Sequence, residues 1–241
     1  MKRALLVVVV CVLLAPGTVF ANPILIDHYA STNPAGGRTF IVAGTGSDPQ
    51  SDTGLFDVPG GKRDTTFTVT SGLATSTANI ITTPVHELAA NWASGSLGNI
   101  KVEYGAYAVI GGAGPDLNLN LSIEYGITFE VVAADLNGGT MNIDLLIDND
   151  GSSGGPTTRT SGPVTINIGS GFYQVPFSSF SGLTTVELGD VDGIRYTVAG
   201  SIDSFDITID SMQSTGVIPE PASLSLLGLG VLALLRRRRK S

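Results

Sequence analysis

The chain has 241 residues, 42% of them hydrophobic, and a formal net charge of −8 at pH 7. Between residues 23 and 218 it has 20 acidic residues against six basic ones, a formal charge of −14, and its only cysteine is Cys11. The acidic charge excludes nucleic acid as a partner, since such a surface repels phosphate backbones. A single cysteine excludes an intramolecular disulfide.

The first segment has the order of a secretory signal peptide. Two basic residues follow the initial methionine, an apolar run covers residues 4–14, and small residues lead up to Ala21. We expect residues 1–21 to form a signal helix that signal peptidase removes by cutting between Ala21 and Asn22. The apolar run is shorter than the ~20 residues that a membrane-spanning helix needs, which favours cleavage over a permanent anchor.

The segment 22–212 predicts one β domain. Residues 117–123 alternate leucine or isoleucine with asparagine or serine, which is typical of a strand with one buried face. Glycine-rich turns separate such segments, so we expect an all-β protein, a single jelly-roll-like antiparallel β-sandwich. Only residues 85–93 look helical, for one or two turns. The alternating pattern recurs at residues 66–70, 100–104, 141–147, 164–168, 194–198 and 205–209.

The loop after residue 147 contains two motif-like strings. Residues 151–155 satisfy the Gly-x-Ser-x-Gly pattern of serine hydrolases, but no helix follows to form the required strand-to-helix turn, so a hairpin loop is favoured. Asp148 and Asp150 begin like a calcium loop, because calcium prefers clustered carboxylate and carbonyl oxygens. A structural calcium here or at Asp190 and Asp192 is the only cofactor that the sequence suggests, since no other cofactor motif is present.

The residue types of the chain bear on two further kinds of site, a Ser-His-Asp catalytic site and an aromatic carbohydrate-binding surface. Only His28 and His86 could serve as bases, which leaves little from which to build a Ser-His-Asp site. Exposed aromatic rings could bind carbohydrate, although aromatic residues in a β domain more often pack in the core. The aromatic candidates are Trp92, Tyr104, Tyr107, Tyr125, Phe172 and Tyr173.

The C-terminus combines three elements after an expected linker at residues 213–218. Prolines on both sides of Glu220 fix φ and prevent helix formation, so the motif Pro219, Glu220 and Pro221 is expected to be extended and readable by an enzyme. Residues 222–235 predict a short hydrophobic transmembrane helix. A basic end that holds the terminus on the cytoplasmic side follows: Arg236, Arg237, Arg238, Arg239 and Lys240.

These elements, in this order, resemble the PEP-CTERM sorting signal of exported bacterial proteins, here residues 219–241. The resemblance implies an exosortase as processing partner, a membrane-anchored intermediate, and delivery to the envelope surface or extracellular matrix. Within the β domain, residues 60–64, 190–194 and 204–210 are similar to ectodomains of PEP-CTERM proteins and to galactose-binding-like jelly rolls. That second similarity implies the architecture rather than a ligand.

The sequence therefore favours an exported, exosortase-sorted surface or matrix protein that is not an enzyme and that associates with exopolysaccharide. Two alternatives remain open at this stage. One is a secreted β-sandwich glycoside hydrolase or esterase, which requires two acids facing each other in a groove. The other is a calcium-dependent adhesin, which requires a calcium-dependent melting temperature.

Overall fold

The computed structural model describes residues 23–32, 36–83, 85–135, 139–147, 156–200 and 204–216. The signal segment, the loop with Asp148 and Asp150, and the sorting tail lie outside the described residues. Residues 23–215 form one compact unit. No helix among the described residues has both the length and the apolar character needed to cross a membrane.

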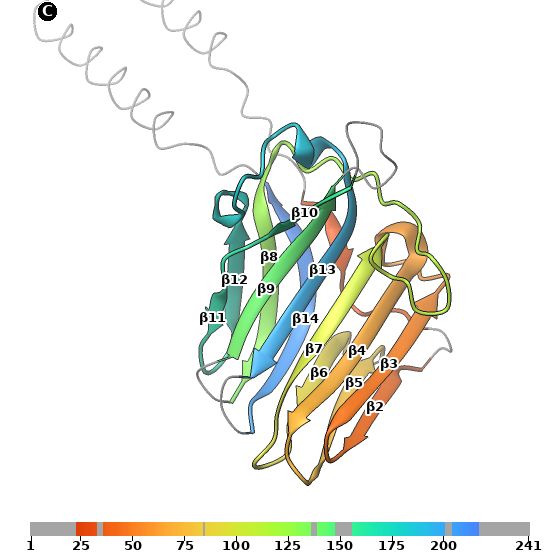
Figure 1. The fold of residues 1–241 in the computed structure, drawn as a ribbon, viewed down its shortest axis with the longest axis vertical. Helices are drawn as coiled ribbons and strands as arrows, with labels where there is room; N and C mark the ends of the chain where they lie inside the picture. Colours follow the sequence, from red (N-terminus) through yellow and green to blue (C-terminus); the bar gives the residue numbers. More distant parts are fainter. Residues whose placement is uncertain are drawn as a thin grey trace, which may run out of the picture. The chain divides into compact units, whose positions relative to one another are not determined.

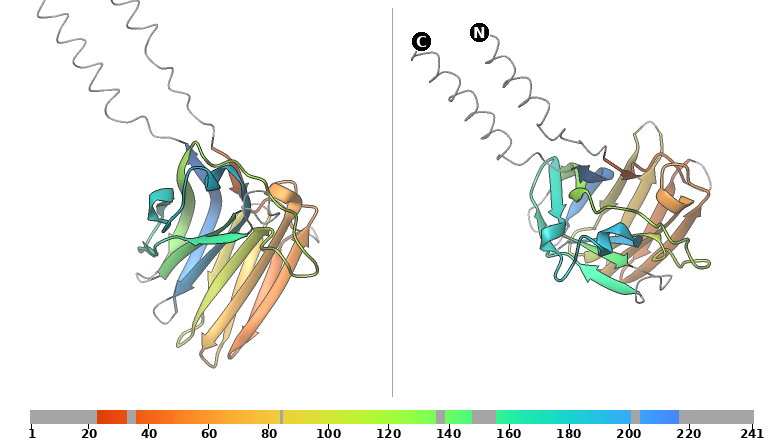
Figure 2. Two further views of the ribbon diagram at one scale, coloured as in Figure 1. Left: turned by 45° about the horizontal axis from the view of Figure 1, so that its top comes forward. Right: turned by 90° about the horizontal axis from the view of Figure 1, so that it is seen from above.

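Two seven-stranded antiparallel sheets pack face to face, as Figures 1 and 2 show. Sheet A has the order β12-β8-β14-β6-β5-β2, with β1 also paired to β14. Its strands are β1 (Leu25–Asp27), β2 (Arg38–Ala43), β5 (Thr75–Ile81), β6 (Glu87–Asn91), β8 (Glu124–Ala134), β12 (Gly171–Pro176) and β14 (Asp206–Gly216).

Sheet B has the order β10-β9-β13-β7-β4-β3, with β11 also paired to β9. The last two strands of the described chain, β13 and β14, lie inside their sheets between earlier strands, as expected for a jelly-roll-like sandwich. The strands of sheet B are β3 (Gly46–Thr53), β4 (Lys62–Ser71), β7 (Leu97–Gly105), β9 (Gly139–Ile147), β10 (Thr157–Thr160), β11 (Val164–Ile166) and β13 (Val191–Gly200). Single 3₁₀ turns are η1 (Pro59–Gly61), η2 (Phe177–Ser179) and η3 (Glu187–Gly189).

The core lies between the sheets and follows the period-2 pattern of the strands. In β9, Met141, Ile143 and Leu145 are fully buried, whereas the residues between them face outward and are partly exposed. Trp92 packs against Phe67 of β4 and Phe205 beside β14, with ring centroids 5.2 and 6.0 Å apart. The expected alternation is thus confirmed for most of the predicted strands, and with it the β-sandwich.

Residues 117–123 do not form the predicted strand. The segment is extended but makes only an isolated bridge, between Leu119 and Val191. Asn118 has φ 49°, in the left-handed region, which breaks the pleat that a continuous strand would need. The alternation here reflects a segment that covers the end of the sandwich, with Leu121 fully buried.

Two further expectations differ from the structure. Residues 87–91, which look helical in sequence, form strand β6 because they pair with β5 on one side and β14 on the other. Packing of Leu88 and Ala90 into the core outweighs the helical tendency of the segment. The expected linker is also shorter, since β14 continues to Gly216, and Ser214 donates its N–H to the Ile24 carbonyl at 2.8 Å.

Candidate functional site

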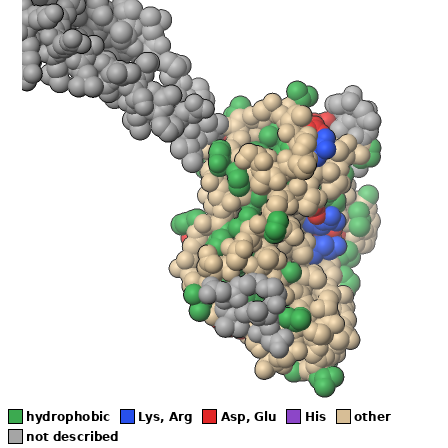
Figure 3. Space-filling model, turned by 60° about the vertical axis from the view of Figure 1, so that its left-hand side comes forward, with side chains coloured by type: hydrophobic (Ala, Val, Ile, Leu, Met, Phe, Trp, Pro, Cys, Tyr) green, Lys and Arg blue, Asp and Glu red, His purple; other side chains and the backbone are tan. Residues whose placement is uncertain are grey.

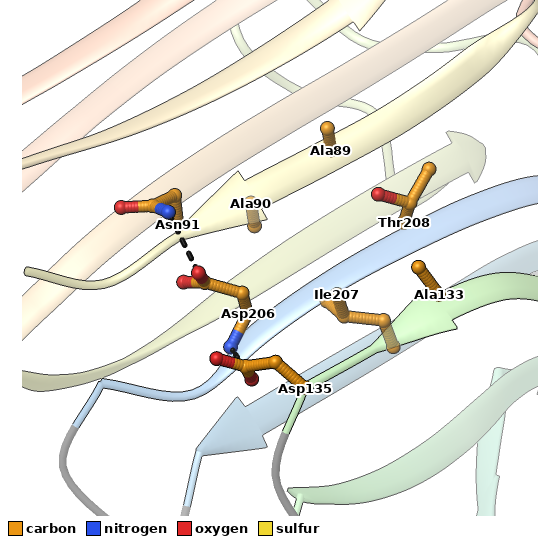
Figure 4. Close-up of a pocket in the computed structure, with 8 residues that line it drawn as sticks. All are labelled: Ala89, Ala90, Asn91, Ala133, Asp135, Asp206, Ile207 and Thr208. Atoms are coloured by element: carbon orange, nitrogen blue, oxygen red, sulfur yellow. Dashed lines mark hydrogen bonds between the residues drawn. The ribbon is translucent and has the colours of Figure 1, made fainter. Parts of the chain in front are cut away.

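The outer face of sheet A contains a hollow of about 220 Å³ between β6, β14 and the end of β8 (Figure 4). Asn91, Asp135 and Asp206 lie at one end of it, and small side chains occupy the rest. Its lining is Ala89, Ala90, Asn91, Ala133, Asp135, Asp206, Ile207 and Thr208.

The hollow results from small residues at outward positions of adjacent strands. Thr208 pairs with Ala89, and Asp206 pairs with Asn91, so these side chains form two rows across β14 and β6. The residues between them in each strand point into the core. Alanine at positions 89 and 133 leaves space where a larger side chain would fill the surface.

The polar end is built from two carboxyl groups that backbone donors hold in place. Asp206 accepts hydrogen bonds from the Asn91 amide at 2.7 Å and from the Trp92 N–H at 3.1 Å. Asp135 accepts the Asp206 N–H at 2.8 Å. Partial burial, and then the neighbouring charge of Asp135, raise the pKa of Asp206 to about 6, against the opposing effect of the Trp92 N–H.

A second group of charged side chains lies in the core and includes Lys62 and Arg63 of the segment 60–64, whose sequence is Gly-Gly-Lys-Arg-Asp. The Arg63 guanidinium is fully buried, donates to both oxygens of Asp27 at 2.8 and 3.0 Å, and donates to the Ser31 carbonyl. Lys62 donates to the carbonyls of Ala108 and Gly112. The segment therefore connects strand β4 to the N-terminal segment and to the loop after β7.

Tyrosines complete this buried cluster. The Tyr104 hydroxyl donates to Asp27 at 2.8 Å, and the hydroxyls of Tyr29 and Tyr196 are hydrogen-bonded to each other. Burial, and then the charge of Asp27, raise the pKa of Tyr104 well above its ordinary value. Burial disfavours the charged form of Arg63 and by itself would lower the pKa of the guanidinium. Attraction to the Asp27 carboxylate and the groups around it is larger in sum, so the pKa is raised. A permanently charged, enclosed group of this kind serves the fold rather than a reaction with a solvent-borne substrate.

The two histidines meet at a place that the sequence did not indicate. Their rings pack edge to face with centroids 5.7 Å apart, and His28 Nδ1 lies 3.9 Å from Asp57 Oδ2. The Ser31 hydroxyl donates to Asp57 and not to a histidine. A nucleophilic triad needs the serine bonded to the imidazole, so this arrangement does not provide one.

The predicted calcium ligands that lie in the described residues are Asp190 and Asp192. Asp192 is buried, and its side chain accepts the Asn118 N–H at 3.2 Å. Asp190 ends η3, where its N–H bonds to the Glu187 carbonyl. In the part of the chain that the structure describes, no group of three or more His, Cys, Asp or Glu side chains is placed to hold a metal.

The aromatic candidates are divided between core and surface. Trp92 and Tyr104 are buried, as the packing alternative requires. Tyr107 stacks on Arg195 of sheet B, with the guanidinium 4.6 Å from the ring centroid. Phe172 is 70% exposed on β12 and Tyr125 is 43% exposed on β8. None of these rings lines the hollow.

Comparison with family models finds a match at the C-terminus of the chain. Residues 217–240 match the PEP-CTERM protein-sorting motif, which marks an exported protein that is sorted to the cell surface. The cleavage pair Ala21 and Asn22, the motif Pro219 to Pro221 and the basic end 236–240 are outside the described residues, so their individual roles stay predictions. No curated protein matches the chain.

Among solved structures, the family 11 carbohydrate-binding module of a cellulosomal cellulase of Clostridium thermocellum is similar, with 13% identity, a TM-score of 0.43, and 83% of this chain and 98% of that chain covered. A metagenome-derived glycoside hydrolase family 12 endoglucanase has 10% identity, a TM-score of 0.37, and coverage of 75% and 99%. An exo-beta-agarase has 10% identity, a TM-score of 0.41, and coverage of 83% and 26%. With TM-scores below 0.5, nothing about the ligand of this chain follows from them.

Proposed function

We propose that this chain is an exosortase-sorted protein of the envelope surface or extracellular matrix, and that its β-sandwich binds polysaccharide without cleaving it. The observation that carries the proposal is the order of its parts. The sandwich is complete when β14 ends at Gly216, and the sorting motif begins at residue 217. What the tail delivers to the surface is therefore one folded β domain.

The route to the surface follows from the two ends. Signal peptidase removes residues 1–21, the segment 222–235 holds an anchored intermediate in the inner membrane, and exosortase acts at or near Pro219 to Pro221. The five basic residues at 236–240 keep the end of the chain on the cytoplasmic side.

The hollow on sheet A is the place where we expect polysaccharide to bind. It offers an amide, a hydroxyl and two carboxyl groups, which together donate to and accept from sugar hydroxyls. Its volume of about 220 Å³ is below the ~300–1,000 Å³ of pockets that enclose a small molecule. A surface hollow of this size suits one unit of a polymer that continues past both ends.

The position of the acids supports binding over hydrolysis. Glycosidases place two carboxyl groups on opposite sides of the scissile bond. Asp135 and Asp206 instead lie side by side at one end of the hollow (Figure 4), and backbone N–H groups occupy an oxygen of each. A binding module needs only such fixed hydrogen-bonding groups.

One observation favours a second function, a secreted glycoside hydrolase. A carboxyl group with a pKa of about 6 next to a second carboxylate is a pairing that general acid catalysis uses. The hydrolase predicts release of reducing ends from polysaccharide, and loss of that release in both Asp206→Asn and Asp135→Asn. Absence of release by the purified protein over its native polysaccharide would leave the binding function alone.

The binding function is tested by filling the hollow. Ala133 lies at its edge and is exposed, so Ala133→Ile would occupy space without disturbing the core. We expect the mature protein with this change to bind its host's exopolysaccharide at least ~10-fold more weakly, which corresponds to about 1.4 kcal/mol, because the isoleucine side chain occupies the space of the sugar unit. Ala43→Ile is the matched control, because Ala43 is also exposed on a strand of sheet A but lies outside the hollow. Equal binding by both variants and the native protein would contradict the proposal.

A further inference from the structure

Among the residues that the structure describes, no basic side chain lines the hollow or forms an ion pair with its two carboxyl groups. Its lining contains two carboxyl groups, one amide and one hydroxyl, and no lysine or arginine. Three further acids occupy outward positions of the strands around it, on β6, β8 and β14: Glu87, Glu130 and Asp210. Within the hollow itself, the charge of Asp135 is one of the two causes that raise the pKa of Asp206.

The basic side chains of the domain are engaged elsewhere. All six bases between residues 23 and 216 form an ion pair with an acid other than Asp135 or Asp206, and five of the six belong to strands of sheet B. On the face drawn in Figure 3, the basic side chains in view lie beside acidic ones. The six pairs are Arg38–Asp52, Lys62–Asp64, Arg63–Asp27, Lys101–Glu103, Arg159–Glu187 and Arg195–Asp144.

The two faces of the sandwich therefore differ in electrostatic potential. On sheet B, Arg195 bonds to Asp144 directly across the strand pair, and Lys101 pairs with Glu103, so opposite charges cancel locally. On sheet A the acids around the hollow have no such partner among the six bases. A hollow lined by one sign of charge concentrates ligands of the opposite sign and repels those of the same sign.

From this charge separation we propose that the hollow is selective for polysaccharides that carry protonated amines, that is, polymers of amino sugars with free amino groups, and that it rejects polysaccharides bearing carboxylate, sulfate or phosphate. The inference rests on the proposed function, since it names the class of glycan that binds at the same site. The ammonium group would sit at the end formed by Asp135, Asp206 and Asn91. The alanine and threonine end would hold the ring of the neighbouring sugar unit.

The geometry fits an ammonium group better than a metal ion. Asp206 already accepts two N–H donors and Asp135 one, so the carboxyl oxygens are held by hydrogen bonds rather than turned together as ligands. A primary ammonium group donates three hydrogen bonds, and each carboxyl oxygen retains a lone pair to accept one. A charge-assisted contact of this kind is about twice as strong as a neutral hydrogen bond.

The test compares three soluble oligosaccharides of equal length with the mature protein purified from its host: a glucosamine oligomer, its fully N-acetylated form, and a uronate oligomer. At low salt and pH 7 we expect the glucosamine oligomer to bind at least ~10-fold more tightly than the acetylated form, and the uronate oligomer not to bind. At about 1 M salt, where charges are screened within about 3 Å, the difference should largely disappear.

Variants assign the effect to the hollow. Asp206→Asn should abolish most of the preference for the glucosamine oligomer, so that the ratio of its affinity to that of the acetylated form falls toward one. Asp48→Asn is the matched control, since it removes one negative charge from β3 and its amide oxygen can still accept the Ile41 N–H. We expect this control to bind as the native protein does.

The outcomes separate the selectivity from the proposed function. Equal binding of glucosamine and acetylated oligomers, both weakened by Ala133→Ile, would overturn the selectivity and leave polysaccharide binding in place. Binding of an oligolysine as tight as that of the glucosamine oligomer would overturn it too, because the hollow would then respond to charge alone. Failure of all oligomers and of the host polysaccharide to bind would overturn both proposals.

Discussion

The buried cluster around Arg63 and the hollow on sheet A each contain an aspartate whose pKa burial raises. They differ in whether the carboxylate has a charged partner within the protein. Asp27 is fully buried, and Arg63 and Tyr104 fill its hydrogen-bonding positions. Asp206 is partly exposed beside a second acid, and none of the ion pairs among the described residues includes it. A matched buried charge fixes the fold, whereas an unmatched charge at the surface is available to a ligand.

The largest expected effect comes from breaking the buried pair. Asp27→Ala would remove the carboxylate to which Arg63 donates two hydrogen bonds and leave the buried guanidinium with Asp52 Oδ2, 3.5 Å away, as its remaining carboxylate. Loss of one partner of a buried ion pair destabilises a protein by about 3–5 kcal/mol. We expect urea unfolding of the variant to show a loss of this size. A change below about 1 kcal/mol would mean that the cluster does not carry the fold.

Replacing both Asp27 and Arg63 tests whether the cost comes from leaving one buried charge without its partner. In Asp27→Leu with Arg63→Met no charge is left uncompensated, so we expect the double variant to be more stable than either single variant. The unfolding free energies of the four proteins form a double-mutant cycle. A purely additive loss would show that the two side chains act independently.

An intermediate effect is expected at Lys62, whose ammonium group donates to the Ala108 and Gly112 carbonyls. Lys62→Met keeps most of the buried stem but leaves these acceptors without their charged donor, at a cost of about 1–3 kcal/mol. Urea unfolding measures the loss, which should be smaller than that of Asp27→Ala. A loss equal to that of Asp27→Ala would contradict the ranking.

A smaller, pH-dependent effect is expected in the hollow. Because the folded state raises the pKa of Asp206 from 3.8 to about 6, the folded protein binds this proton more tightly than the unfolded chain. Its contribution to stability is present below pH 3.8 and is lost as the pH rises through about 6. The stability of the native protein relative to Asp206→Asn should therefore fall between these pH values and stay constant above them. We expect a total change of less than about 1 kcal/mol, because the group is partly exposed and solvent screens its interactions. A difference that rises with pH would contradict this assignment.

The smallest expected effect is that of calcium. Asp192 is already hydrogen-bonded to Asn118, so we expect calcium or a chelator to change the melting temperature by less than about 1 °C, within the scatter of a scan. A calcium-dependent adhesin predicts otherwise. Saturation at 100 times the dissociation constant would add about 2.7 kcal/mol of stability, and several degrees to the melting temperature.

The two regions also differ in how much of them could be predicted from sequence. Alternation in segments such as residues 141–147 predicted strands and the sandwich, because burial of one face acts residue by residue. The pair Asp27–Arg63 joins residues 36 positions apart and depends on how β1 and β4 meet, which alternation does not encode. The sequence shows the charged residues of the segment 60–64 but not the residues that they contact in the fold.

The hollow was harder still to predict. It arises from the small side chains of Ala89 on β6 and Ala133 on β8. These strands are separated in the chain by β7 and in the sheet by β14. Asp206 lies in the alternating segment 205–209, but its neighbour Asp135 directly follows another strand, β8, and alternation does not indicate that the two acids meet. The alternation at residues 117–123 does not indicate a strand, because an extended segment without strand partners can also place leucines against the core. Leu121 is fully buried and Leu117 and Leu119 pack against the core, whereas Ile123 is 58% exposed.

The most direct test of the account is the intact mass of the protein recovered from its host's envelope and medium, compared with that from a host lacking exosortase. We expect loss of residues 1–21 in both hosts, and loss of the tail at or near Pro219 to Pro221 only where exosortase is present. A full-length tail in both hosts would mean a permanent membrane anchor and would contradict delivery of the sandwich by sorting.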